Sequence, residues 1–104
     1  MIQPVITEKL ADISHLCVRH GVHQLDLFGS AVGEAFDPKS SDLDFLVEFV
    51  ELTPAAHADA FFGLMEDLEK LFGRAVDLVE KRAIRNPYFQ QTITEKQINV
   101  FHAI

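Results

Sequence analysis

The sequence predicts a single domain of the α/β (α+β) class, in which helices pack on a mixed sheet of about four strands. The chain has 104 residues, which fits one compact domain. Segments with helical and strand periodicity alternate along it. Hydrophobic residues make up 48% and charged residues 24%, which is ordinary globular usage. We therefore expect one domain over residues 1–104.

The first helix is expected over residues 7–20. Its apolar positions recur at spacings of three and four: Leu10, Ile13, Leu16 and Cys17. Thr7 is a candidate N-cap, and Gly21 is placed to end the helix. Cys17 falls on the apolar stripe, so we expect a small buried side chain there.

Two strands are expected next. Residues 23–28 (HQLDLF) alternate between polar and apolar and end at the turn Gly29-Ser30, and residues 31–41 follow as a loop after at most a short helix near 31–35. Residues 42–50 (DLDFLVEFV) alternate more strictly. One face of this strand is fully apolar and should face the core, and the other carries Asp42 and Asp44.

A long helix is expected from the N-cap pair Thr53-Pro54 to Phe72, with Gly73 as its stop. Its apolar stripe should be core: Phe61, Leu64, Met65, Leu68, Leu71 and Phe72.

Three further elements complete the chain: a strand over 75–79, a short helix over 87–95 after Asn86-Pro87, and a last strand over 98–101. The basic residues Lys81, Arg82 and Arg85 lie between the first two. They are either a solvated charge run or groups that steer ATP.

The composition excludes several classes of protein. Nine Lys and Arg against sixteen Asp and Glu give a net charge of −7, which argues against a broad footprint on nucleic acid or anionic lipid. One cysteine allows no internal disulfide, and the five histidines lack zinc-ligand spacing. Neither a signal peptide nor a membrane span is visible, so we expect a cytoplasmic protein.

Three carboxylates form the candidate catalytic and metal-binding group. Asp42 and Asp44 are two residues apart on a strand and so project from one face, and Asp77 lies in a later strand. Like charges this close repel unless a cation or a shared proton offsets them, and Mg²⁺ prefers such oxygen ligands. The alternatives without a function are that Asp42 and Asp44 belong to a solvated strand start, and that Asp77 pairs with Arg74 or Lys81.

The turn Gly29-Ser30 is the candidate nucleotide-binding element. Glycine permits a close backbone approach, and the Ser30 hydroxyl and the following N–H groups can hold phosphate oxygens. An ordinary strand-to-helix turn is the alternative. Two metal ions between the carboxylates could clamp an in-line phosphoryl displacement, with Asp77 helping to activate the attacking hydroxyl.

These residues carry a family resemblance. LFGSAVGEAFDPKSSDLDFLVEF, followed by VDLV, resembles the Gly-Ser, Asp-x-Asp and distal Asp pattern of the DNA polymerase β-like nucleotidyltransferase superfamily. The length resembles its minimal nucleotidyltransferase (MNT) branch, and RNPYF at 85–89 is similar to one group of these proteins. The resemblance implies that Gly29 and Ser30 hold nucleotide phosphates, and that Asp42, Asp44 and Asp77 bind the metal ions and catalyse.

The resemblance also implies a partner. Members of the branch act as antitoxins beside a helical HEPN-domain toxin and transfer AMP from ATP to a tyrosine on it. Many relatives carry an Arg shortly after Gly-Ser, where this chain has Ala31-Val32-Gly33-Glu34. Lys39, Arg82 or Arg85 could replace that charge.

Two other functions stay open at this point. The missing Arg motivates a catalytically idle binding module that neutralises its partner by association. Nucleotidyl transfer to a small molecule, such as an aminoglycoside, is the other, and it would need a second domain or a dimer to complete the acceptor pocket. The sequence leaves open whether the chain forms a homo-oligomer.

Overall fold

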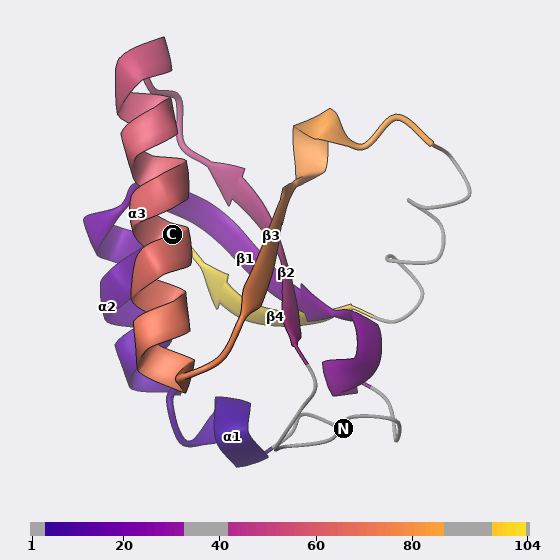
Figure 1. Ribbon diagram of the computed structural model, residues 1–104. Helices are drawn as coiled ribbons and strands as arrows, with labels where there is room; N and C mark the ends of the chain where they lie inside the picture. The colour runs from indigo at the N-terminus through magenta and orange to yellow at the C-terminus, as the bar shows by residue number, and fades with distance from the viewer. Residues whose placement is uncertain (1–3, 33–41, 87–96, 104) are drawn as a thin grey trace.

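The predicted mixed sheet with helices packed on it is confirmed. The computed structural model describes residues 4–32, 42–86 and 97–103. A four-stranded sheet of order β3-β2-β1-β4 carries helices α2 and α3 against one face (Figure 1). The strands are β1 (Val22–Phe28), β2 (Leu43–Phe49), β3 (Val76–Glu80) and β4 (Ile98–His102).

Two kinds of strand pairing make the sheet mixed. β1 pairs antiparallel with both β2 and β4, whereas β2 and β3 are parallel neighbours. Parallel neighbours need a crossover connection, which α3 supplies. The β2–β3 register runs from Leu43 opposite Val76 to Val47 opposite Glu80. The amino ends of β2 and β3 therefore lie together, at the lower edge of the sheet in Figure 1.

The prediction of one N-terminal helix capped by Thr7 is wrong. Thr7 is the last residue of α1 (Pro4–Thr7), and α2 (Leu10–Arg19) begins after Lys9, which makes no side-chain capping hydrogen bond. Ile6 is fully buried in the same core as the apolar stripe of α2. The apolar periodicity thus continues from α1 into α2, so periodicity alone does not reveal the break between the two helices.

The predicted ends of the long helix are confirmed by α3 (Pro54–Phe72). The Thr53 hydroxyl accepts a hydrogen bond from the Ala56 N–H at 3.3 Å. Gly73 ends the helix with φ 64° and donates its N–H to the Glu69 carbonyl at 2.8 Å. This left-handed conformation favours glycine.

The core lies between the sheet and the helices. Alternate residues of β2 and β1 point into it, together with the apolar stripes of α2 and α3. Its members include Leu25, Leu27, Leu43, Phe45, Val47, Ile13, Cys17, Leu64, Leu68 and Phe72. Phe28 and Leu46 form a second, smaller buried cluster with Val79 and Ile84. Strand alternation places this second cluster on the face opposite the helices.

Two short 3₁₀ helices follow strands: η1 (Gly29–Val32) after β1, and η2 (Lys81–Ala83) after β3. The rest of the predicted loop at 33–41 and the predicted helix at 87–95 lie outside the described residues. Within the described ranges, no helix combines the length and apolarity that crossing a membrane requires.

Candidate active site

Gly29 brings the turn after β1 against the carboxylate of Asp44. Phe28 is opposite Asp44 in the β1–β2 register, so Gly29 follows at the end of the paired segment. Gly29 has φ 73°, and a Cβ built on it would lie 3.0 Å from the Asp44 Cγ and closer still to Oδ2. Both the backbone conformation and the space therefore require glycine at this position.

Asp44 and Asp77 form a carboxylate pair. They are opposite each other on the neighbouring parallel strands β2 and β3, and their side chains hydrogen-bond. Burial, the hydrogen bond with Asp77 and the negative charges of Asp77 and Asp42 raise the pKa of Asp44 to about 6. Asp44 therefore keeps its proton to a higher pH than an ordinary aspartate does.

Asp42 contributes to this site through its charge. It lies exposed immediately before β2 and acts on Asp44 electrostatically. Among the residues that the structure describes, no three His, Cys, Asp or Glu side chains are already grouped closely enough to hold a metal ion. The donor chemistry nevertheless fits a hard divalent cation, because oxygen ligands with excess negative charge are what such a cation prefers.

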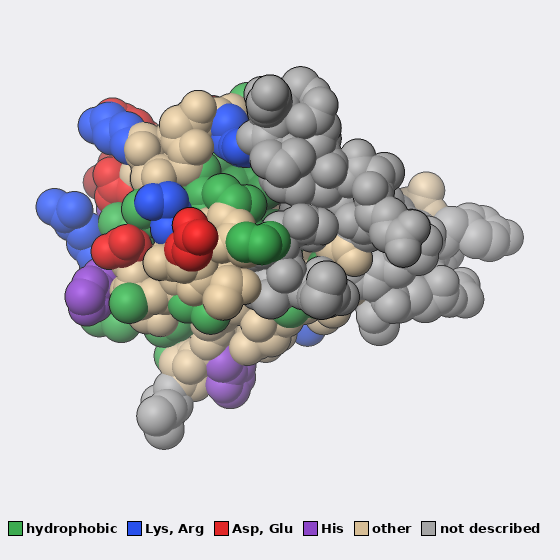
Figure 2. Space-filling model, turned by 90° about the horizontal axis from the view of Figure 1, so that it is seen from below, with side chains coloured by type: hydrophobic (Ala, Val, Ile, Leu, Met, Phe, Trp, Pro, Cys, Tyr) green, Lys and Arg blue, Asp and Glu red, His purple; other side chains and the backbone are tan. Residues whose placement is uncertain are grey.

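The structure thus brings Gly29, Asp44 and Asp77 together at one end of the sheet. Ser30 belongs to η1 beside them, although its side chain lies outside the described part of the chain. Figure 2 views the molecule from this end. Acidic and basic side chains lie intermixed on its described surface, which carries no continuous basic patch.

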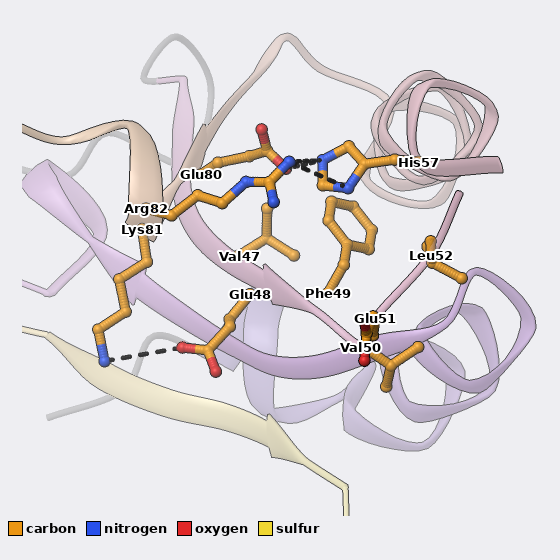
Figure 3. A pocket seen from close by; sticks show the side chains of 10 residues that line it. All are labelled: Val47, Glu48, Phe49, Val50, Glu51, Leu52, His57, Glu80, Lys81 and Arg82. Atoms are coloured by element: carbon orange, nitrogen blue, oxygen red, sulfur yellow. Dashed lines mark hydrogen bonds and ion pairs between the residues drawn. The ribbon is translucent and has the colours of Figure 1, made fainter. Parts of the chain in front are cut away.

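The basic residues after β3 lie at the other end of the parallel strands. Lys81 pairs with Glu48 at 3.8 Å, and Arg82 contacts His57 at 3.3 Å. Both line a pocket of about 540 Å³ at the carboxyl ends of β2 and β3 (Figure 3). Asp44 and Asp77 are not among its lining residues, so this pocket is distinct from the carboxylate site. Lys39 lies outside the described residues.

Asp26 is a buried carboxylate that sequence reasoning missed. It is 3% exposed and accepts hydrogen bonds from Gln24 and Asn99 at 2.9 Å and from Gln97 at 3.5 Å. The strand pattern places it on the polar face of β1, which predicts exposure. Gln24 is a neighbour on β1, but Asn99 and Gln97 come from β4 and its approach, and the pairing of β4 with β1 brings them to Asp26.

The nucleotidyltransferase domain model matches residues 13–100 of the chain. A Methanocaldococcus jannaschii protein, provisionally named a protein adenylyltransferase, is 40% identical over 79% of this chain and 80% of its own length. The protein adenylyltransferase MntA of Thermococcus cleftensis is 38% identical over 74% of both chains.

Solved structures share the fold. A protein provisionally named a minimal nucleotidyltransferase superposes with a TM-score of 0.67 at 30% identity, over 94% of this chain and 95% of that one. A Shewanella oneidensis complex of a tri-AMPylated HEPN toxin with its MNT antitoxin superposes with a TM-score of 0.64 at 19% identity, over 94% of this chain and 73% of that one. The chain therefore belongs to the nucleotidyltransferase domain family, in its minimal nucleotidyltransferase branch, and is a nucleotidyl-transferring enzyme.

Proposed function

We propose that this chain transfers AMP from ATP to a tyrosine hydroxyl of a HEPN-type toxin and so acts as its antitoxin. The observation that carries the proposal is the Asp44–Asp77 pair directly beside the Gly29 turn. A phosphate-holding turn next to paired carboxylates is the arrangement that nucleotidyl transfer needs. The names of the adenylyltransferase relatives and the AMPylated toxin in the solved complex support this choice of reaction and partner.

Each residue has a role in this reaction. Backbone N–H groups at Gly29 and Ser30, and the Ser30 hydroxyl, hold the ATP phosphates. Asp42, Asp44 and Asp77 hold Mg²⁺, with two ions expected. Bound Mg²⁺ neutralises charge that develops on the phosphate oxygens. Without it, the carboxylates would repel the nucleotide.

The transfer step needs a base for the acceptor hydroxyl. Asp77 is exposed on β3, which is an edge strand of the sheet, so an acceptor can reach it. The tyrosine oxygen forms a bond to the α-phosphorus, the bond from that phosphorus to the bridging oxygen breaks, and pyrophosphate leaves. The phenolic proton goes to the Asp77 carboxylate. The acceptor comes from the partner.

The direct test uses ATP labelled at the α-phosphate, Mg²⁺ and the product of the gene adjacent to the one that encodes this chain, which we expect to be a HEPN-type protein. We expect label on that protein, and none on a variant of it whose acceptor tyrosine is replaced by Phe. Absence of label on every protein with Mg²⁺ or Mn²⁺ would overturn the proposal. Label on an added aminoglycoside instead would assign a small-molecule acceptor.

A double variant separates catalysis from association. Asp42→Asn with Asp44→Asn should abolish neutralisation of the toxin, because both carboxylates are needed for transfer. A circular dichroism spectrum and the retained complex on gel filtration control for folding and binding. If the folded double variant still neutralised the toxin, the chain would act by association alone.

A further inference from the structure

A second pocket lies at the carboxyl ends of the parallel strands β2 and β3, away from the aspartate site. In open α/β sheets ligands characteristically bind outside the carboxyl ends of parallel strands. The pocket holds about 540 Å³, and small-molecule sites typically have about 300–1,000 Å³. Four elements build it: the end of β2 with its exit loop, the first turn of α3, the last residue of β3, and η2 (Figure 3).

At one end of the pocket, three polar or charged side chains contact one another: His57, Glu80 and Arg82. His57 Nε2 donates a hydrogen bond to Glu80 Oε1, and Arg82 Nη2 lies 3.4 Å from His57 Nδ1. The His57 and Glu80 side chains are 17% and 20% exposed, so packing holds both in place. The Phe49 ring meets the His57 ring edge to face, with ring centroids 5.1 Å apart.

These groups have unused binding capacity. A carboxylate can accept several hydrogen bonds, so Glu80 can hold His57 and an ammonium group of a ligand together. Arg82 has five N–H donors in a planar fork that matches a carboxylate, and its contact with His57 uses one nitrogen. Glu80, which can bind a cation, and Arg82, which can bind an anion, therefore lie side by side at this end of the pocket.

The rest of the pocket has both charged and apolar walls, and Glu51 is a further carboxylate in its lining. Val47 separates the His57, Glu80 and Arg82 group from the Lys81–Glu48 ion pair in Figure 3. Phe49, Val50 and Leu52 line the remaining wall. A ligand body that lies along Phe49, Val50 and Leu52 would bury apolar surface, while adjacent opposite charges meet Arg82 and Glu80.

We propose that this pocket binds a free α-amino acid with an aliphatic or aromatic side chain. The α-carboxylate pairs with the Arg82 guanidinium, and the α-ammonium group pairs with Glu80. The side chain packs on Phe49, Val50 and Leu52. A molecule that carries both charges on one carbon satisfies the two groups at once, so the site discriminates against blocked amino acids.

The test is a titration of the ¹⁵N-labelled protein followed by amide chemical shifts. L-Leucine and L-phenylalanine should shift the backbone amides of Val47, Phe49 and Glu80 in a saturable way. N-acetylleucine and leucinamide should each bind at least about tenfold more weakly, because each lacks one charge-assisted interaction. This readout does not depend on AMP transfer, so it stands whether or not the proposed function holds.

A matched pair of variants locates the site. Arg82→Gln should weaken leucine binding by about tenfold or more, because the guanidinium fork is lost. Arg85→Gln should leave it unchanged, since Arg85 is exposed and lies outside the lining of the pocket. No shift with either amino acid, equal binding of the blocked analogues, or equal binding by Arg82→Gln would overturn the proposal.

Discussion

At the scale of single residues, the candidate site contains two features that lower stability: a contact between two carboxyl groups and a glycine in a left-handed conformation. Asp44 lies half-buried beside Asp77, and burial together with this contact raises its pKa to about 6. Gly29 is held in a left-handed conformation against the same carboxylate. Two acids in contact repel each other unless a cation or a proton offsets their charge, so the arrangement supports the proposal that these carboxylates hold Mg²⁺.

Gly29→Ala should destabilise the fold more than Gly73→Ala. Both glycines have left-handed φ values, 73° and 64°, so each substitution costs about 1–2 kcal/mol in backbone strain. A Cβ on Gly73 would meet nothing within 4 Å, whereas one on Gly29 would collide with Asp44. Urea unfolding of the two variants measures the difference. Equal losses in the free energy of unfolding would contradict this, because they would mean that the new Cβ at position 29 costs nothing against Asp44.

Asp44 should make the metal-free protein less stable as the pH rises. Its folded pKa of about 6 lies above the ordinary value of 3.8, so its contribution is fully present below pH 3.8 and is lost as the pH rises through about 6. Asp44→Asn should therefore gain about 1 kcal/mol at neutral pH, a value reduced for solvent screening of a half-exposed group. Urea unfolding on both sides of this range tests it, and a variant with the wild-type pH slope would refute it.

At the scale of elements, the sequence predicts those helix ends that carry a capping residue and misses those that carry none. Thr53-Pro54 and Gly73 mark α3, because a hydroxyl acceptor, a fixed φ and a left-handed glycine each act locally. Lys9 begins α2 with no side-chain cap, so the break after Thr7 leaves no local mark. The pairing of Asp44 with Asp77 needed the strand order, which local sequence does not encode.

Asp67 links α3 to the carboxyl end of α2 through polar contacts. His20 Nε2 hydrogen-bonds to Asp67 Oδ2 at 2.6 Å, Arg19 pairs with the same oxygen at 3.8 Å, and the His20 bond is the main cause that lowers the pKa of Asp67. A lowered folded pKa adds stability above the ordinary pKa, and that stability is lost as the pH falls through the folded value. Asp67→Asn should cost about 1 kcal/mol at neutral pH.

Thermal or urea unfolding at neutral and acidic pH measures this cost, with Asp59→Asn on the exposed face of α3 as control. The difference between Asp67→Asn and wild type should shrink in acid. A difference that stays constant down to acidic pH would contradict an electrostatic link between the two helices.

At the scale of the whole molecule, the parallel pair β2–β3 has different chemistry at its two ends. The amino ends hold the carboxylates and the glycine turn, and the carboxyl ends hold the pocket with His57, Glu80 and Arg82. The alternation of helices and strands predicted the layers. The separation of Arg82 from Asp77 follows from the strand between them, which carries the chain away from Asp77 before η2 begins. The contact of His57 with Glu80 and Arg82 could not be predicted, because it depends on how α3 packs against the sheet.

The single cysteine reports on opening of the whole core. Cys17 is 0% exposed, and burial raises the pKa of its thiol to about 12, so the thiolate is scarce in the native protein. A colorimetric thiol reagent should react slowly with the native protein and promptly after addition of denaturant. Stoichiometric labelling of the native protein at the rate of a free thiol would show that the α2–sheet interface is open.

The most direct measurement is the single-turnover rate of AMP transfer from ATP to the HEPN-type partner, for wild type, Asp44→Asn and Asp59→Asn. The carboxylate site predicts that Asp44→Asn loses at least about a hundredfold in rate. Asp59→Asn, on the exposed face of α3, should retain the wild-type rate. Transfer by folded Asp44→Asn at the wild-type rate, or no transfer by wild type, would contradict the account.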